Sequence, residues 1–180
     1  MPIVMLIGGA RSGKSALAVR LACSQPAPVV VIATAEAGDD DMASRIARHR
    51  TERPPSFETV EEPLALSEAI AGLPADRCLI IDCLTLWTSN MLAIRGPVEI
   101  EAAAGAAAAQ AAARPGLTIA VTNEVGLGIV PEHPLARSYR DLLGRVNTVW
   151  SAAAQRAYLL VAGQALALSP ADELLLGELT

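Results

Sequence analysis

The chain alternates between short apolar runs and longer segments that have the spacing of helices. Uninterrupted apolar runs of about four or five residues are typical of strands buried on both faces of a sheet. We expect strands at residues 3–7, 29–33, 57–60, 78–81, 117–121, 158–161 and 165–168. The strongest candidates are the first, second and fourth of these runs, because each is continuously apolar.

Helical composition fills most of the intervals between these runs. The acidic cluster at residues 39–41 is typical of a helix N-terminus, and Pro115 ends an alanine-rich helix that Gly105 weakens. We expect helices at residues 14–23, 39–50, 63–71, 84–92, 99–113 and 134–156. Strands that alternate with helices in this way predict an α/β fold, with a mostly parallel sheet and helices on both faces.

Composition narrows the class of protein. A chain of 180 residues predicts one domain over residues 1–180. The formal net charge of −5 argues against a general nucleic-acid binder, which needs clustered basic side chains facing phosphates.

The cysteines and the N-terminus bear on location. The three cysteines, Cys23, Cys78 and Cys83, are odd in number and lack paired zinc-site spacing, so we expect a reduced, cytoplasmic protein. Gly8 and Gly9 interrupt the N-terminal apolar run well before the roughly 18 residues that a spanning helix needs. We therefore expect neither export nor a membrane segment.

A phosphate-binding loop is the clearest motif. The pattern G-x-x-x-x-G-K-[S/T] lies between an apolar strand and a helix, the context that distinguishes it from an ordinary glycine-rich turn. Backbone N–H groups of such a loop and the following helix N-terminus bind phosphate oxygens. The predicted nucleotide-binding residues here are Gly8, Gly9, Ala10, Arg11, Ser12, Gly13, Lys14 and Ser15. Lys14 is expected to reach the β- and γ-phosphates, and the Ser15 hydroxyl to bind Mg²⁺.

Two acidic residues follow predicted strands. Asp82 ends the strand at residues 78–81, where an acid can hold Mg²⁺ directly or through water. It could instead cap the helix at residues 84–92. Glu124 follows the strand at residues 117–121 and so lies at the ligand-binding edge of the sheet, although a solvated loop acid explains it equally well.

Any histidine chemistry must use His49 or His133. His133 lies in a loop between prolines and is expected to be exposed. Met42, Ile46 and His49 share one helix face, which should point toward the body of the protein. His49 is therefore either a packed histidine in a basic last turn, where it complements the helix dipole, or a nucleophile for an α-phosphate.

Several stretches, in order along nearly the whole chain, resemble one family. They are residues 8–15, 32–34, 40–42 with Arg45, Ile46 and His49, Arg53-Pro54, residues 82–85, 122–131, 135–137, Arg140-Asp141 and 144–147. The family is the bifunctional adenosylcobinamide kinase / adenosylcobinamide-phosphate guanylyltransferase of cobalamin biosynthesis. The alanine-rich segment at residues 97–115 and His133 match no motif of it.

The resemblance implies a RecA-like P-loop fold, a homotrimer, and a catalytic His49 that carries GMP as a covalent intermediate, with Lys14 also catalytic. It implies further nucleotide contacts from Ala33, Thr34, Ala35, Arg50, Thr51, Glu52, Arg53, Glu61 and Asp82. Glu62, beside Glu61, could be the matching residue instead.

The implied reactions are phosphorylation of adenosylcobinamide by ATP or GTP, and transfer of GMP from GTP to adenosylcobinamide phosphate, with Mg²⁺ as cofactor. Two alternatives remain open from the residues alone. One is a P-loop kinase for another small alcohol, in which His49 is structural. The other is a nucleotide-switched binding protein, although the chain lacks a guanine-reading N-K-x-D motif.

Overall fold

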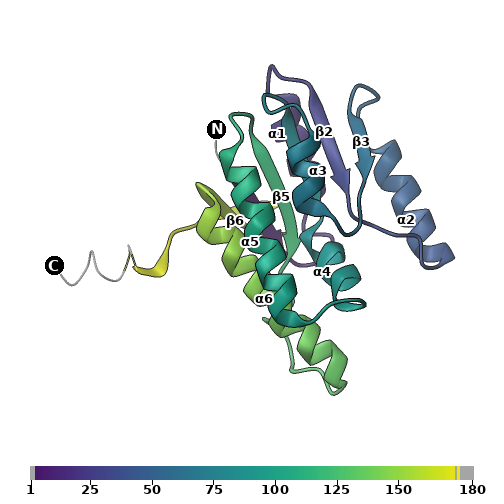
Figure 1. Ribbon diagram of the computed structural model, residues 1–180, viewed down its shortest axis with the longest axis vertical. Helices are drawn as coiled ribbons and strands as arrows, with labels where there is room; N and C mark the ends of the chain where they lie inside the picture. Colours follow the sequence, from purple (N-terminus) through teal and green to yellow (C-terminus); the bar gives the residue numbers. More distant parts are fainter. Residues whose placement is uncertain (1–2, 173, 175–180) are drawn as a thin grey trace.

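The computed structural model describes residues 3–172 and residue 174 (Figure 1). Within this part of the chain the strands are β1 (Ile3–Gly8), β2 (Val29–Ala33), β3 (Glu58–Glu61), β4 (Cys78–Asp82), β5 (Thr118–Asn123), β6 (Arg156–Val161) and β7 (Gln164–Leu168). The helices are α1 (Lys14–Cys23), α2 (Asp40–Thr51), α3 (Leu66–Gly72), α4 (Leu84–Leu92), α5 (Pro97–Ala113) and α6 (Pro134–Ala153).

The strands form one sheet in the order β3-β2-β4-β5-β1-β6-β7. All neighbouring pairs from β3 to β6 in this order are parallel, whereas β7 pairs antiparallel with β6. The predicted mostly parallel sheet is therefore confirmed. Because parallel strands end at the same edge, the segments that follow β1, β2, β4 and β5 are brought together there.

Two layers of apolar side chains cover the sheet. Leu79 and Ile81 of β4 pack in one core with α3, α4, α5 and α6, and Ile80 packs in the other with α1. In Figure 1 helices α3, α4, α5 and α6 lie in front of the strands. This two-faced burial explains why the central strands read as continuous apolar runs rather than as alternating ones.

The alanine-rich segment forms a continuous helix through Gly105 and packs closely. Its small side chains Ala104, Ala107, Ala108 and Ala111 are all buried, and α5 packs against α6 and α3. The helix begins at Pro97, two residues before the predicted start, because the Glu99 carboxylate accepts a 3.0 Å hydrogen bond from the Gly96 amide and closes the first turn.

Two further predicted helix boundaries were wrong by three residues. The last helix ends at Ala153 rather than Arg156, because the Gln155 amide donates to the Ile3 carbonyl and Arg156 already pairs with Val4 of β1. The helix expected from Pro63 begins at Leu66, because the Glu62 carboxylate accepts from the amides of Leu64 and Ala65 and holds a turn there. Tertiary pairing overrides helical composition in the first case, and local capping does so in the second.

Helix α2 stands at the β3 end of the sheet and has no buried residue (Figure 1). Its ends are favourable locally: the Asp39 side chain accepts from the Met42 amide at 2.7 Å, and basic residues occupy the last turn. Met42, Ile46 and His49 are its less exposed positions, so the predicted inward-facing side is confirmed.

A polar bridge joins α6 to the carboxyl end of β5. The buried Asn147 accepts from the Thr122 hydroxyl at 2.7 Å and donates to the Asn123 carbonyl at 3.0 Å. Both bonds fix the backbone at the point where β5 leaves the sheet.

We expect Asn147→Ala to lower the free energy of unfolding by about 1–3 kcal/mol, because the substitution leaves the Thr122 hydroxyl and the Asn123 carbonyl without the side-chain amide that they bond. Urea denaturation measures the change. Thr148→Ala, at the exposed neighbouring position, is the matched control and should change the free energy of unfolding by less than about 0.5 kcal/mol. Equal effects of the two substitutions would contradict the role given to the bridge.

Candidate active site at the carboxyl edge of the sheet

The phosphate loop follows β1 and leads directly into α1. Gly13 adopts a left-handed backbone, with φ of 98°, immediately before the first helical residue. A Cβ at Gly8 would lie 2.3 Å from the Leu160 carbonyl oxygen, so the loop can leave the sheet beside β6 only with glycine there. The N-terminus of α1 therefore points into the loop, as anion binding requires.

Lys14 lies across this loop with only 7% of its surface exposed. Its Nζ donates to the carbonyls of Gly8 and Gly9, at 2.9 and 2.7 Å, and contacts Ser12 Oγ at 3.3 Å. Burial lowers the pKa of Lys14, against the opposing influence of Cys83 and Asp82. The ammonium group is thus held at the point where the loop encloses phosphate.

A cavity of about 810 Å³ joins the phosphate loop to the inner face of α2. Most of the predicted site residues line it, namely Ala10, Arg11, Ser12, Gly13, Lys14, Ser15, Ala33, Ala35, His49, Arg50, Glu52, Arg53, Glu61 and Asp82. Its volume suits a nucleotide-sized ligand.

Four predicted residues do not line the cavity. Gly8 and Gly9 use their carbonyls to hold Lys14. The Thr51 hydroxyl donates to the Arg48 carbonyl at 2.8 Å, on the exposed side of α2. Thr34 is buried, and its hydroxyl donates to the Cys83 carbonyl at 2.7 Å and accepts from the Cys83 amide at 2.9 Å. Gly8, Gly9 and Thr34 shape the site without lining it, whereas Thr51 neither lines the site nor contacts a residue across it.

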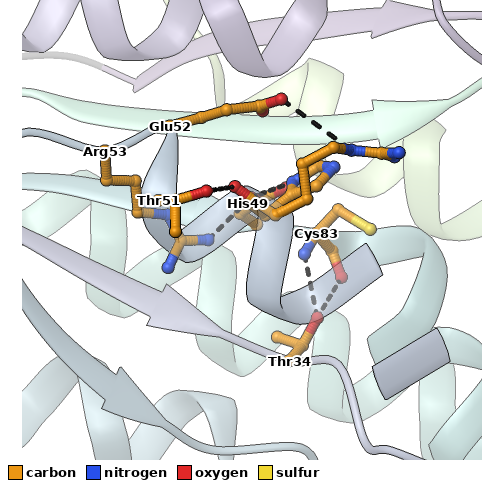
Figure 2. Close-up of polar contacts among 8 residues, drawn as sticks. Thr34, His49, Thr51, Glu52, Arg53 and Cys83 are labelled. Carbon is orange, nitrogen blue, oxygen red and sulfur yellow. Dashed lines mark hydrogen bonds and ion pairs between the residues drawn. The ribbon is translucent and has the colours of Figure 1, made fainter. Parts of the chain in front are cut away.

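Two basic side chains from the end of α2 and the following turn meet on the Asp82 carboxylate. The Arg53 guanidinium donates to Oδ2 at 3.0 Å, and His49 Nδ1 lies 3.6 Å from the same oxygen. In Figure 2 the imidazole and the guanidinium converge, with Thr34 and Cys83 below them in the view. Asp82 therefore connects β4 to a helix that has no buried residue of its own.

This cluster shifts the pKa of both titrating partners. Contact with the Asp82 carboxylate raises the pKa of His49, which partial burial alone would lower. Burial would raise the pKa of Asp82, but the imidazole of His49 and the charge of Arg53 lower it overall. The carboxylate is therefore ionised near neutral pH and faces Nδ1 of the imidazole.

The alternative that Asp82 caps α4 is wrong. Cys83 occupies the N-cap position, and no side chain caps the helix there. The Asp82 carboxylate points instead toward α2, because Arg53 and His49 supply charged partners that a helix N-terminus only partly replaces.

The structure separates the two adjacent glutamates. Glu61 lines the cavity and forms an ion pair with Arg50. Glu62 faces the other way and accepts from the first amides before α3. Of the pair, Glu61 is the one placed to meet a ligand.

His133 and Glu124 fall outside the cavity lining. His133 is exposed at the start of α6, as predicted. The amide of Glu124 donates to the Gly8 carbonyl at 3.2 Å, while its carboxylate accepts from the Gly126 amide. Glu124 thus supports the turn after β5 beside the phosphate loop.

Sequence reasoning missed three polar residues of this edge. Asn90 donates to the Thr34 carbonyl at 2.8 Å, and the Thr85 hydroxyl accepts from the Asn123 amide at 2.7 Å. Thr85 and Asn123 also line the cavity. Thr85 and Asn123 had a signal in the chain, because Thr85 comes shortly after β4 and Asn123 ends β5, at the edge where ligands bind, whereas Asn90 lies within α4 and had none.

Comparison with known proteins identifies the family. The model of the family described as cobinamide kinase / cobinamide phosphate guanyltransferase matches residues 4–168. The chain belongs to this family. The resemblance inferred from the motifs is confirmed.

Curated relatives agree over most of their length. A bifunctional adenosylcobalamin biosynthesis protein, CobP of Pseudomonas aeruginosa, is 44% identical over 160 residues, which cover 88% of this chain and 92% of that protein. The proteins of the same description named CobU are 38% identical in Escherichia coli and 39% in Salmonella typhimurium, each over 89% of this chain and 96% of the relative.

A solved structure supports the fold alone. An ATPase from the type III secretion system of pathogenic bacteria shares 14% identity with a TM-score of 0.51. The match covers 89% of this chain and 52% of that one, so this chain spans about half of the ATPase. The P-loop fold class is confirmed.

We expect the pKa of His49 to lie above its ordinary value of 6.5 and to fall in Asp82→Asn, because the substitution removes the charge that favours the imidazolium. The attraction between these groups should stabilise the fold while Asp82 is ionised and His49 is protonated, and it should be lost as the pH rises through the pKa of His49. NMR titration of the imidazole measures the shift.

Asp40→Asn is the matched control, because it removes the same charge from the exposed first turn of α2. It should leave the His49 titration close to that of the wild-type chain. An unchanged titration in Asp82→Asn would show that the carboxylate does not govern His49 in solution.

Proposed function

We propose that this chain phosphorylates adenosylcobinamide and then transfers GMP from GTP to adenosylcobinamide phosphate through a guanylylated His49. The observation that carries the proposal is that His49 and Lys14 line one cavity. A histidine beside a phosphate loop adds to a kinase site the nucleophile that a covalent nucleotidyl transfer needs. Membership of a bifunctional family supports both steps.

In the kinase step the phosphate loop binds ATP or GTP, and Lys14 offsets charge on the β- and γ-phosphates. The aminopropanol hydroxyl of adenosylcobinamide attacks the γ-phosphorus and gives up its proton. The new O–P bond replaces the bond to the bridging oxygen, and the nucleoside diphosphate leaves. Positioning and charge stabilisation supply most of the catalysis in reactions of this type.

In the guanylyl step neutral His49 attacks the α-phosphorus of GTP. Its Nδ1 faces Asp82, which leaves Nε2 as the attacking nitrogen. An N–P bond forms, the bond from the α-phosphorus to the bridging oxygen breaks, and pyrophosphate leaves. A phosphate oxygen of adenosylcobinamide phosphate then attacks the same phosphorus, releases the imidazole and gives adenosylcobinamide-GDP.

Arginines surround the path of this second reaction. Arg11, Arg45 and Arg53 all line the cavity with His49. Their positive charge attracts the triphosphate and stabilises the pyrophosphate that leaves. Ala33, Ala35, Arg50 and Glu61 complete the proposed nucleotide contacts on the β2 and β3 side.

Magnesium fits the same cavity. Ser15 and Asp82 both line it and offer the hard oxygen atoms that Mg²⁺ prefers. Arg53 and His49 both contact Oδ2 of Asp82, so Oδ1 is the oxygen suited to the ion or to one of its waters. When bound, Mg²⁺ would neutralise charge on the triphosphate.

The proposal extends to the organisation of the protein. We propose that residues 1–180 form one nucleotide-binding catalytic domain, acting as a cytoplasmic homotrimer without a nucleic-acid partner. None of the helices within residues 3–172 is both long and apolar enough to cross a membrane. The net charge of −5 supports the absence of nucleic-acid binding.

We expect incubation with Mg²⁺ and GTP labelled at the α-phosphate to give a covalent adduct that is acid-labile and alkali-stable, as a phosphoramidate is. His49→Ala should form no detectable adduct and no adenosylcobinamide-GDP, while keeping most of its kinase activity. His133→Ala replaces the other histidine, which is exposed and outside the cavity lining, and should label like the wild-type chain.

Two results would contradict this assignment. A folded wild-type chain that binds GTP but forms no adduct would favour a P-loop kinase for another alcohol, or a nucleotide switch. Loss of both activities in folded His49→Ala would indicate a structural histidine.

Lys14→Ala should reduce both the kinase rate and the rate of adduct formation by roughly 10²- to 10³-fold, because the same ammonium group binds the triphosphate in both reactions. Steady-state kinase assays and single-turnover labelling measure the two rates. Arg20→Ala, at an exposed position of the same helix, is the control and should leave both rates near wild type. A Lys14→Ala protein that keeps either rate would show that the two reactions use different phosphate sites.

A further inference from the structure

The segment between β5 and α6 belongs to one of the stretches that resemble the family, but it is not part of the nucleotide site. Beyond Asn123 it contributes no residue to the cavity lining. Its large apolar side chains face solvent: Ile129 is 97% exposed, Leu127 83%, and Val130 and Leu135 58% and 59%. We call residues 124–135 the apolar loop; they are the segment between β5 and α6 together with Pro134 and Leu135, the first two residues of α6. Contiguous exposed apolar side chains of this kind mark an interaction site rather than a core element.

The apolar loop is tied to the rest of the protein at both ends. At its beginning the Glu124 amide donates to the Gly8 carbonyl at 3.2 Å. At its end Arg137 Nη1 donates to the carbonyls of Pro131 and Glu132, at 3.0 and 2.5 Å. These bonds present the apolar side chains outward from a fixed base.

The loop begins at the rim of the nucleotide cavity. The Glu124 amide donates to the Gly8 carbonyl, which also accepts from Lys14. Asn123, the residue before it, lines the cavity. In the sheet, β5 lies between β4 and β1, whereas α2 follows β2 on the side of the edge strand β3. A ligand on the loop would therefore lie beside the phosphate loop, which follows the adjacent strand β1.

The acceptor of the proposed reactions needs a surface of this kind. A cavity of about 810 Å³ suits a nucleotide, and a corrinoid macrocycle is too large to share it. The macrocycle carries methyl groups on its faces and amides at its rim, and its reactive hydroxyl or phosphate is at the end of a flexible arm. An apolar surface beside the phosphate loop can hold the ring while the arm reaches the phosphorus.

We propose that the apolar loop is the docking site for the corrinoid ring of adenosylcobinamide and of its phosphate. This inference rests on the proposed function, from which the acceptor is taken. Leu127 and Ile129 are its principal contacts, because they are the most exposed apolar side chains of the loop. The ring binds there in both reactions, so the same arm meets the γ-phosphorus in one and guanylylated His49 in the other.

The test measures the affinity for adenosylcobinamide directly. Ultrafiltration separates free from bound corrinoid, and the visible absorbance of the corrinoid gives the amount of each. We expect Leu127→Ser and Ile129→Ser each to weaken binding roughly tenfold, since each removes a large apolar contact. The rate of GMP-adduct formation should not change, because it needs no corrinoid. Leu166→Ser, 63% exposed on β7, is the matched control and should bind like the wild-type chain.

Sedimentation velocity tests the alternative that a second copy of the chain covers this surface. If the loop variants sediment as smaller species than the wild type, the loop packs against a second copy of the chain and the proposal is overturned. Unchanged corrinoid affinity in both variants also overturns it. If the wild-type chain forms the GMP adduct but binds no adenosylcobinamide, the acceptor in the proposed function is wrong. The proposed docking site is then wrong as well.

Discussion

The parallel pairing of β1 with its neighbours is the constraint on which the site depends. Parallel strands end at one edge, so the phosphate loop after β1, Asp82 at the end of β4 and Asn123 at the end of β5 meet there. Buried polar bonds fix these ends: Thr34 holds the backbone of Cys83, and Asn147 holds the end of β5. The apolar core supplies the stability, and this polar layer supplies the geometry.

Helix α2 is attached by charge rather than by apolar packing. None of its residues is buried. The helix and the turn after it contact the sheet side through charged pairs: His49 and Arg53 with Asp82, and Arg50 with Glu61. The Arg50–Glu61 pair is half exposed and contributes little, whereas the contacts to Asp82 are more protected from solvent. The same carboxylate therefore attaches the helix and orients its histidine.

The two sides of the edge have different chemistry. The α2 side gathers arginines, His49 and Glu61 around a polar cavity suited to a nucleotide. The β5 side carries exposed apolar residues on a loop that starts at the phosphate-binding turn. A phosphoryl or nucleotidyl transfer needs donor and acceptor to be held next to one phosphorus, and the pairing of β5 with β1 brings the apolar loop beside the phosphate loop.

The sequence alone determined the order of strands and helices, the phosphate loop and the α/β class, because continuous apolar runs and local glycine and lysine spacing encode them directly. The family followed from its motifs. Only the tertiary structure decided that Asp82 faces His49 and Arg53 instead of capping α4, that Glu61 rather than Glu62 meets the cavity, and that Arg156 belongs to β6. Each of these depends on contacts between residues that are distant in the chain. Local propensity does not include the free energy of such contacts.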